Sequence, residues 1–251
     1  MTTTPTSPEN QIVLQKAGVW FLEKIIDSHI KNTEKLKNAS EFNLNPLLNP
    51  YLSAFLTGEV TPEGIAKALV YGRVLVTSIT TSFGSNIQSF ISNVLVDAYG
   101  SLAQGVDIVF IDKVDGGQKY AQLKLGPNTI NKDDVKSIHD HFNSVRNLAR
   151  TNNVRLNSDS LIMGIMYGEE SQLSAHYKKL RDEHHYPTFV GKDFWVRLTG
   201  DPLFFEKLIQ TISDTLSQVN SQQLIEDTIS KLAQDEQIIQ LAKLGSPTTK
   251  P

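Results

Sequence analysis

The order of predicted elements indicates an α/β fold in which helices flank a central mixed β-sheet. Three observations support this prediction. Residues 105–126 resemble two strands of a hairpin joined by a glycine-containing turn: on the first strand Val106, Ile108 and Phe110 face one way, and on the second Gln122 and Lys124 share one face. Residues 160–167 form an almost continuous apolar run, which is typical of a central strand buried on both faces. The segments around these strands repeat apolar residues at helical spacing, so helices are expected to cover the sheet.

The N-terminal part of the chain is predicted to be helical. Residues 1–9 are rich in Thr, Pro and Ser, and we expect them to be disordered. Residues 10–58 form a helical N-terminal segment, for which dimerisation is one possible use. Its helix runs from residue 10 to about 38, and an irregular connection rich in Asn follows over 39–58. The apolar stripe of the helix is Val13, Ala17, Trp20, Phe21, Ile25 and Ile26.

Residues 59–210 are predicted to form the core domain. Thr61 and Pro62 have the chemistry of a helix start, and this helix extends to about Val76. Residues 77–86 contain six hydroxyls and one amide. This stretch is expected to be a loop that either caps the next helix or donates hydrogen bonds to a polymer backbone.

Further elements follow the hairpin in order. They are a helix from about 134 to 150, the buried strand, a polar helix over 169–184, a short strand over 188–190, a loop over 191–200, and helices over 201–219 and 221–243. The helices of residues 211–245 are assigned to a C-terminal helical part, and residues 246–251 to a tail. The first and last helices are expected to form a helical subdomain.

Composition excludes several classes of protein. The chain has 251 residues, of which 39% are hydrophobic and 20% charged, as in an ordinary globular protein. It has no cysteine, so disulfides and thiolate metal sites are excluded. The net charge of −3 argues against a protein held to nucleic acid by bulk charge alone. We find no signal peptide and no apolar run of transmembrane length, and expect a cytoplasmic protein.

Several familiar sites are absent from the sequence. There is no Walker-type phosphate loop, no GxGxxG after a strand and no GxSxG elbow. His139 and His141 lie two residues apart on a predicted helix, so they face different directions. His184 and His185 lie at a predicted helix end, where a solvated role near the helix dipole is expected. These patterns do not favour a zinc site.

The hairpin carries the strongest candidate for chemistry. Gln122 and Lys124 lie two residues apart on one strand and share a face, and Asp107 on the other strand can join them. Carboxylate, amide and backbone carbonyl oxygens are ligands that suit Mg²⁺, which also binds phosphate. A nearby ammonium can orient an attacking water and offset charge on the phosphate. The pattern therefore suits phosphodiester hydrolysis, although an exposed face of an edge strand would have the same spacing.

These residues also resemble a known family. Asp107 followed by Gln122-Leu-Lys124 looks like the PD-(D/E)xK nuclease motif. The flanking blocks together resemble a group of type II restriction endonucleases that cut DNA at GGNCC or at longer sites containing it. The blocks are AKAL (66–69), RVL (73–75), TSITTSFG (77–84), GVDI (105–108), GPNTINKDDV (126–135) and FWVRLTG (194–200). The resemblance covers about residues 45–210.

The resemblance implies a restriction-endonuclease-like core over residues 59–210, Mg²⁺ as cofactor, and a role for each motif residue. Asp107 matches the metal-binding acid, and Lys124 matches the catalytic lysine. The carbonyl of Leu123 would be a further metal ligand. Gln122 departs from the family pattern, which usually has Glu or Asp, so metal affinity would be weaker or another acid would assist. Val106 stands where the pattern often has Pro.

The resemblance further implies a homodimer on a palindromic DNA site in a bacterial cytoplasm, with a cognate methyltransferase in the same system. Candidate DNA-binding residues are Arg73, Thr80, Ser82, Asn86, Asn128, Asn131, Lys132 and Arg150. Helix capping or a surface salt bridge is the alternative role for each. Two other functions stay open. One is another nuclease of the same superfamily, acting in repair or on DNA structure. The other is a catalytically inactive DNA-binding protein, which the departure at Gln122 motivates.

Overall fold

The computed structural model describes residues 6–96 and 105–245, apart from the side chains at 76–81, 83, 85, 87 and 96. The chain divides into two compact units. Unit 1 comprises Met1–Trp20 and Ile87–Ser213 and contains the sheet. Unit 2 comprises Phe21–Asn86 and Asp214–Pro251, and its described elements are helical. No helix in the described ranges is both long and apolar enough to cross a membrane.

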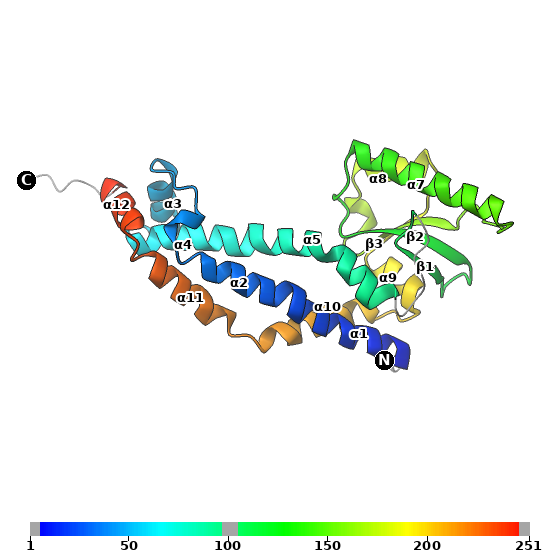
Figure 1. The fold of residues 1–251 in the computed structure, drawn as a ribbon, viewed down its shortest axis with the longest axis horizontal. Helices are drawn as coiled ribbons and strands as arrows, with labels where there is room; N and C mark the ends of the chain where they lie inside the picture. Colours follow the sequence, from blue (N-terminus) through cyan, green and yellow to red (C-terminus); the bar gives the residue numbers. More distant parts are fainter. Residues whose placement is uncertain (1–5, 97–104, 246–251) are drawn as a thin grey trace, which may run out of the picture. The chain divides into compact units, whose positions relative to one another are not determined.

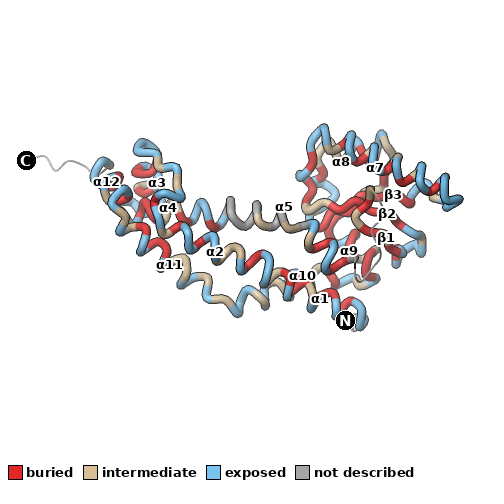
Figure 2. Tube along the Cα trace, viewed as in Figure 1, coloured by how far each residue is buried: buried red, intermediate tan, exposed pale blue. Residues whose placement is uncertain are grey.

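The sheet of unit 1 has four strands in the order β1-β2-β3-β4. They are β1 (Ile108–Ile111), β2 (Gln118–Lys124), β3 (Leu161–Ile165) and β4 (Thr188–Val190). The β1–β2 pair is antiparallel, whereas β2–β3 and β3–β4 are parallel, so the predicted mixed sheet is confirmed. All five residues of β3 are buried, as the apolar run predicted for a central strand (Figure 2).

The turn between β1 and β2 is a glycine turn, as the sequence predicted. The Asp112 N–H donates to the Gly117 carbonyl at 2.9 Å, and the Gly116 N–H donates to the Asp112 carbonyl at 2.8 Å. Gly116 has φ +73°, a left-handed conformation that a side chain would strain. The turn therefore fixes the register of the hairpin.

Helices cover both faces of this sheet (Figure 1). One face carries α7 (Lys132–Thr151) and α8 (Ala175–Asp182), and the other carries α9 (Lys192–Thr199). Gly164 of β3 is in close contact with α9, because a Cβ built on it would lie 2.5 Å from Phe194. The remaining described elements of unit 1 are α1 (Pro8–Trp20), the end of α5 (Ile79–Phe90, from Ile87), η4 (Ile91–Val96), η5 (Glu170–Gln172) and most of α10 (Phe204–Ser217).

The prediction of a loop over 191–200 is wrong, because α9 occupies this stretch. Gly191 (φ +51°) and Gly200 (φ +72°) bound the helix, and Gly200 is its left-handed C-cap. Phe194, Trp195 and Leu198 are buried on one side of it. Large apolar residues at helical spacing between two glycines therefore form a short amphipathic helix.

Unit 2 is built on helices from both ends of the chain. They are η1 (Phe21–Ile26), α2 (Asp27–Lys35), η2 (Ala39–Glu41), α3 (Leu48–Thr57), α4 (Pro62–Gly72), η3 (Arg73–Ser78), α5 (Ile79–Phe90, up to Asn86), the end of α10, α11 (Ser221–Leu232) and α12 (Glu236–Gly245). Its core includes Leu36, Ile65, Ala66, Val70, Val74, Ile229, Leu232, Ile238 and Leu241. Thr61 caps α4 by accepting a hydrogen bond from the Gly64 N–H at 3.0 Å, as its position before Pro62 predicted.

Two further connections turn out to be helical. Residues 39–58 contain α3 rather than only an irregular connection; Pro50 lies in its first turn, where proline is tolerated. Residues 77–86 continue η3 and α5 rather than forming a loop. Asn86 Nδ2 donates to the Ser82 carbonyl at 2.8 Å, a local bond that a polar side chain can make within a helix.

Several boundaries differ from those predicted. Residues 59–86, expected in the core domain, group with unit 2, because α4 packs into the helical core. The helix expected over 10–38 is α1, η1 and α2 in succession, and the helix expected over 221–243 is divided into α11 and α12. Of the tails expected at 1–9 and 246–251, residues 1–5 and 246–251 lie outside the described residues, whereas Pro8 and Glu9 already belong to α1, so the expectation of disorder is wrong there.

Candidate functional site

The β1–β2 hairpin brings Asp107 close to the strand that carries Gln122 and Lys124. The paired register of the hairpin ends with Ile108 opposite Ala121. Asp107 lies just before this register, and its N–H donates to the Ala121 carbonyl at 2.8 Å. Gln122 and Lys124 lie two residues apart on β2, so these two side chains share a face.

Two hydrogen bonds hold the half-buried Asp107 carboxylate. Its Oδ2 accepts from the Leu123 N–H at 2.6 Å, and its Oδ1 accepts from Gln88 Nε2 at 3.4 Å. The first bond ties the acid to the strand that carries the rest of the site. Gln88 belongs to α5, and sequence reasoning did not single it out. No local pattern could have done so, because nineteen positions separate the partners.

Gln122 is 7% exposed, and its amide nitrogen is fully engaged. Nε2 donates to the Gly105 carbonyl at 2.8 Å and lies 2.9 Å from His141 Nδ1. If Nε2 of Gln122 donates a hydrogen in both contacts, the His141 ring accepts through Nδ1 and carries its own proton on its Nε2. The carbonyl oxygen Oε1 is then the atom of Gln122 that is left for a cation.

Lys124 ends β2 and is half-buried. Within residues 6–96 and 105–245 it makes no ion pair. The other lysine of β2, Lys119, behaves differently: its Nζ lies 2.6 Å from Asp159 and 3.0 Å from Asp115. The two lysines lie on opposite faces of the strand, so Lys119 holds the hairpin while Lys124 remains available to a ligand.

The donor set around Asp107 fits a hydrated hard cation. In the described part of the chain, no three His, Cys, Asp or Glu side chains come together as a metal site. A metal here would therefore meet one carboxylate, the Gln122 amide oxygen and the Leu123 carbonyl. Mg²⁺ is commonly held by one or two carboxylates with waters and phosphate completing its shell, so few protein ligands are sufficient.

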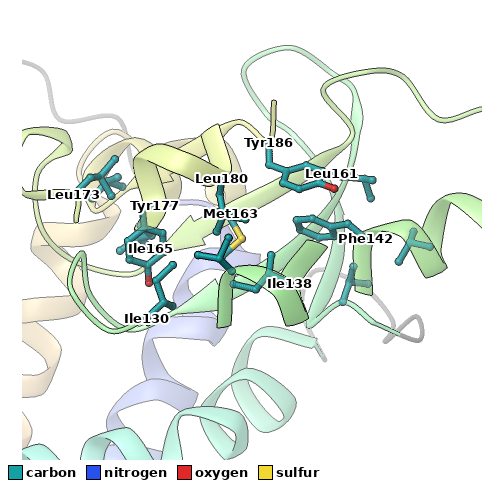
Figure 3. Packing of buried hydrophobic residues seen from close by; sticks show 14 residues of the cluster. Ile130, Ile138, Phe142, Leu161, Met163, Ile165, Leu173, Tyr177, Leu180 and Tyr186 are labelled. Atoms are coloured by element: carbon teal, nitrogen blue, oxygen red, sulfur yellow. The ribbon is translucent and has the colours of Figure 1, made fainter. Parts of the chain in front are cut away.

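Helix α7 carries His141 to the site, and its position is well determined by packing. Asn131 caps its start by accepting from the N–H groups of Asp133 at 2.8 Å and Asp134 at 3.0 Å. Ile138 and Phe142 then pack towards β3 in the core of unit 1 (Figure 3). His141 lies between these two buried positions and reaches the Gln122 amide. Sequence reasoning missed this role because it arises from tertiary packing.

Four of the predicted DNA-binding residues lie in unit 2, whereas Asp107, Gln122 and Lys124 lie in unit 1. Arg73 is exposed in η3, and Ser82 and Asn86 are half-buried in α5. The side chain of Thr80 lies outside the described residues. The carbonyl of Ser82 accepts from Asn86, so this amide has a local partner.

The other predicted DNA-binding residues flank α7. Asn128, Asn131 and Lys132 are exposed and lie at or just before its N-terminus. The Asn131 side chain makes the capping bonds, which is the alternative role that the sequence left open. Arg150 is exposed in the last turn, about 27 Å along the helix from Lys132 at 1.5 Å per residue. These residues therefore do not form one compact patch.

The two histidines of α7 face different neighbours, as their spacing predicted. His139 Nδ1 lies 2.9 Å from the Tyr186 hydroxyl, and the His139 and His184 rings lie 4.4 Å apart. Burial, together with the nearby His139, lowers the pKa of His184. His184 is thus half-buried against α7 rather than fully solvated, while His185 is exposed.

Comparison with known proteins gives one match and one negative result. A family model described as type II restriction endonuclease EcoO109I matches residues 19–220, which is most of the chain. The match includes the hairpin, α7 and the FWVRLTG block of α9. A search of curated proteins returned no match.

Proposed function

The chain belongs to the family of the type II restriction endonuclease EcoO109I, and on this premise we propose that Asp107, Gln122, Leu123 and Lys124 form its active site with Mg²⁺. Membership makes the protein a site-specific deoxyribonuclease that binds DNA. The observation that carries the proposal is the 2.6 Å hydrogen bond from the Leu123 N–H to Asp107 Oδ2, which holds the acid against the strand that carries Gln122 and Lys124. A PD-(D/E)xK motif likewise needs its first acid beside the strand that carries its lysine.

We propose that Asp107, the Leu123 carbonyl and Gln122 Oε1 hold the metal. Bound Mg²⁺ would supply charge that stabilises the phosphate as negative charge builds on it. The bond from the Leu123 N–H keeps Oδ2 of Asp107 directed at β2, so acid and carbonyl stay close together. The neutral Gln122 lowers the charge of this ligand set by one unit relative to Glu or Asp.

Lys124 is proposed to orient the water that attacks phosphorus. Its ammonium is half-buried and has no ion pair among the residues that the structure describes. A cation without a fixed partner at the metal site can donate to the water and offset the charge of the phosphate. Its position two residues after Gln122 supports this role.

We propose that the DNA site is a palindrome containing GGNCC and that a homodimer binds it, because protein symmetry matches the symmetry of the site. The GGNCC-containing site is supported by the sequence blocks that resemble those of enzymes with this specificity. Asn128 and Lys132 are the favoured base-reading candidates, because both are exposed and follow the proposed catalytic strand. A methyltransferase of the same specificity would protect the host DNA.

The test is to incubate plasmid DNA with the protein and Mg²⁺ and to map the ends of the fragments. We expect double-strand breaks at GGNCC-containing sites and none with a chelator. Lys124→Ala should reduce cleavage by about three orders of magnitude or more, and DNA binding in a gel-shift assay should persist. Normal cleavage by this variant would contradict the role of Lys124.

The other outcomes separate the alternatives. Ends scattered over the plasmid or confined to branched structures would favour a repair or structure-specific nuclease. DNA binding without cleavage at any Mg²⁺ or Mn²⁺ concentration would favour a catalytically inactive protein and would contradict the proposed active site.

A further inference from the structure

The corner formed by Gly105, Gln122 and His141 is organised around a single amide group. Gln122 Nε2 lies 2.8 Å from the Gly105 carbonyl oxygen and 2.9 Å from His141 Nδ1. Gly105 has φ +89°, and a Cβ built on it would lie 3.1 Å from the His141 carbonyl oxygen. Glycine thus allows the chain before β1 to approach α7 closely, and this approach puts both acceptors within reach of one nitrogen.

The two ends of an amide differ chemically, whereas the two oxygens of a carboxylate are equivalent. A glutamine at a metal site must therefore point its oxygen at the cation, because a flipped amide would present an NH₂ group to it. One acceptor would not fix the amide firmly, since the second hydrogen would have no partner. With two acceptors beside Nε2, the nitrogen end of the Gln122 amide is held in the corner, and the oxygen Oε1 faces away from it.

We infer that His141 is a positioning residue, which together with the Gly105 carbonyl holds Gln122 so that Oε1 faces the metal. This inference rests on the proposed function, in which Gln122 is a metal ligand. It assigns a reason to the departure from the family pattern: the surroundings of residue 122 suit an amide. A carboxylate in the same position would bring an oxygen next to the Gly105 carbonyl oxygen, which can only accept.

The experiment measures Mn²⁺ affinity, so that it does not depend on cleavage. Free Mn²⁺ is followed by electron paramagnetic resonance in titrations of the full chain and its variants without DNA. His141→Ala should weaken Mn²⁺ binding by about 10- to 100-fold, the usual effect of removing a group that orients a metal ligand. His141→Asn should restore most of the affinity, because Asn Oδ1 occupies the position of His Nδ1 relative to the backbone and also accepts.

Two further variants separate positioning from folding. His141 is exposed, so truncating it leaves no cavity, and thermal unfolding should be close to that of the parent. His139→Ala is the matched control, since it removes a histidine from the same helix that contacts Tyr186 instead. In the double variant Gln122→Ala/His141→Ala, Mn²⁺ affinity should fall no further than in Gln122→Ala, because the two residues act as one unit.

The outcomes distinguish this inference from the proposed function. If Gln122→Ala weakens Mn²⁺ binding and His141→Ala does not, the positioning role is wrong and the active site stands. If Gln122→Ala binds Mn²⁺ as the parent does, Gln122 is not a ligand and both assignments fall. Equal losses in His141→Ala and His141→Asn would also overturn the inference, because an acceptor would then be irrelevant.

Discussion

At the scale of single residues, Lys119 is where the ion pairs of the hairpin converge. Its side chain is 2% exposed, and its Nζ contacts Asp159 at 2.6 Å and Asp115 at 3.0 Å. Burial by itself lowers the pKa of Lys119, but the bonds to Asp159 and Asp115 outweigh it and leave the pKa raised. The charged lysine therefore depends on its partners, as a buried charge must.

Because of these ion pairs, the stability of the folded state is expected to fall at acid pH. The bond to Lys119 lowers the pKa of Asp159 below its usual value. A carboxyl whose pKa is lower in the folded state stabilises the fold above its unfolded pKa, and loses that contribution as the pH falls through the folded value. We expect the melting temperature to fall steeply below about pH 4, near the ordinary pKa of aspartate. Asp159→Asn should give a shallower fall, measured by circular dichroism from neutral pH downwards.

The matched control for this experiment is Asp182→Asn, an exposed aspartate that is paired with Arg181 on α8. Because that pair has no buried partner, its loss should change the pH dependence less. If the melting temperature falls with pH in the same way in the parent and in Asp159→Asn, the Lys119–Asp159 pair does not contribute to the loss of stability in acid.

The candidate site was predictable from sequence in its motif but not in its supporting residues. Gln122 and Lys124 share a face because a strand alternates with period two, and a hairpin can bring Asp107 beside them; both points can be read without a structure. Gln88 and His141 reach Asp107 and Gln122 from helices, across 19 positions in each case. Such contacts depend on how α5 and α7 pack, so local spacing contains no signal for them.

At the scale of elements, β3 and α9 are in close contact on the face of the sheet that α9 covers. A Cβ on Gly164 would lie 2.5 Å from a ring carbon of Phe194 and 2.6 Å from a methyl of Leu123. Both neighbours are buried and cannot move freely. We expect Gly164→Ala to lower the free energy of unfolding by roughly 1–3 kcal/mol through overpacking, measured by urea denaturation.

Gly72→Ala provides the contrast. Gly72 ends α4, and a Cβ there would meet nothing within 4 Å. Alanine is favoured over glycine in a helix by about 0.5–1 kcal/mol, so this variant should be neutral or slightly more stable. Similar destabilisation in both variants would show that crowding against α9 is not the cause.

The same elements show where sequence reasoning succeeds and fails. The hairpin, β3 and α7 were predicted because a Gly-containing turn between two strand-like stretches, a continuous apolar run and an Asn cap are local signals. Helix α3, the part of α5 up to Asn86, and helix α9 were missed because their segments contain Pro, many hydroxyls or flanking Gly. Packing decides these cases: Trp195 of α9, for example, is 1% exposed and donates to the Met166 carbonyl at 2.8 Å.

At the scale of the whole molecule, the proposed cleavage of both strands of a palindrome would require two active sites, one from each chain of the proposed homodimer. The α3 surface offers a way to pair two copies. We define it as the exposed apolar residues of α3 and the position before it: Leu47, Leu48, Tyr51, Leu52, Phe55 and Leu56. Residues 42–58 contain no charged side chain, so two copies of this surface can meet across a two-fold axis without like-charge repulsion.

The size of the α3 surface is compatible with a dimer contact. Phe55 is 79% exposed and Tyr51 60%, and their rings stack with centroids 6.0 Å apart. At about 150–250 Å² per aromatic side chain, these two alone present on the order of 300 Å². The four leucines add to this, which approaches the roughly 800 Å² per partner of a standard interface. Such a surface on a monomer would be unusually apolar.

We therefore predict that Phe55→Glu combined with Tyr51→Glu converts a dimer into a monomer. Like charges facing one another across the axis would oppose pairing, and sedimentation velocity should show a shift from twice the chain mass to the chain mass. The variant should nick plasmid or cut it poorly at low protein concentration, because one active site reaches one strand. Val114→Glu, at an apolar residue outside the α3 surface that is 58% exposed in the β1–β2 turn, is the control and should stay dimeric. If the double variant sediments and cleaves like the parent, α3 is not the surface through which the two copies pair.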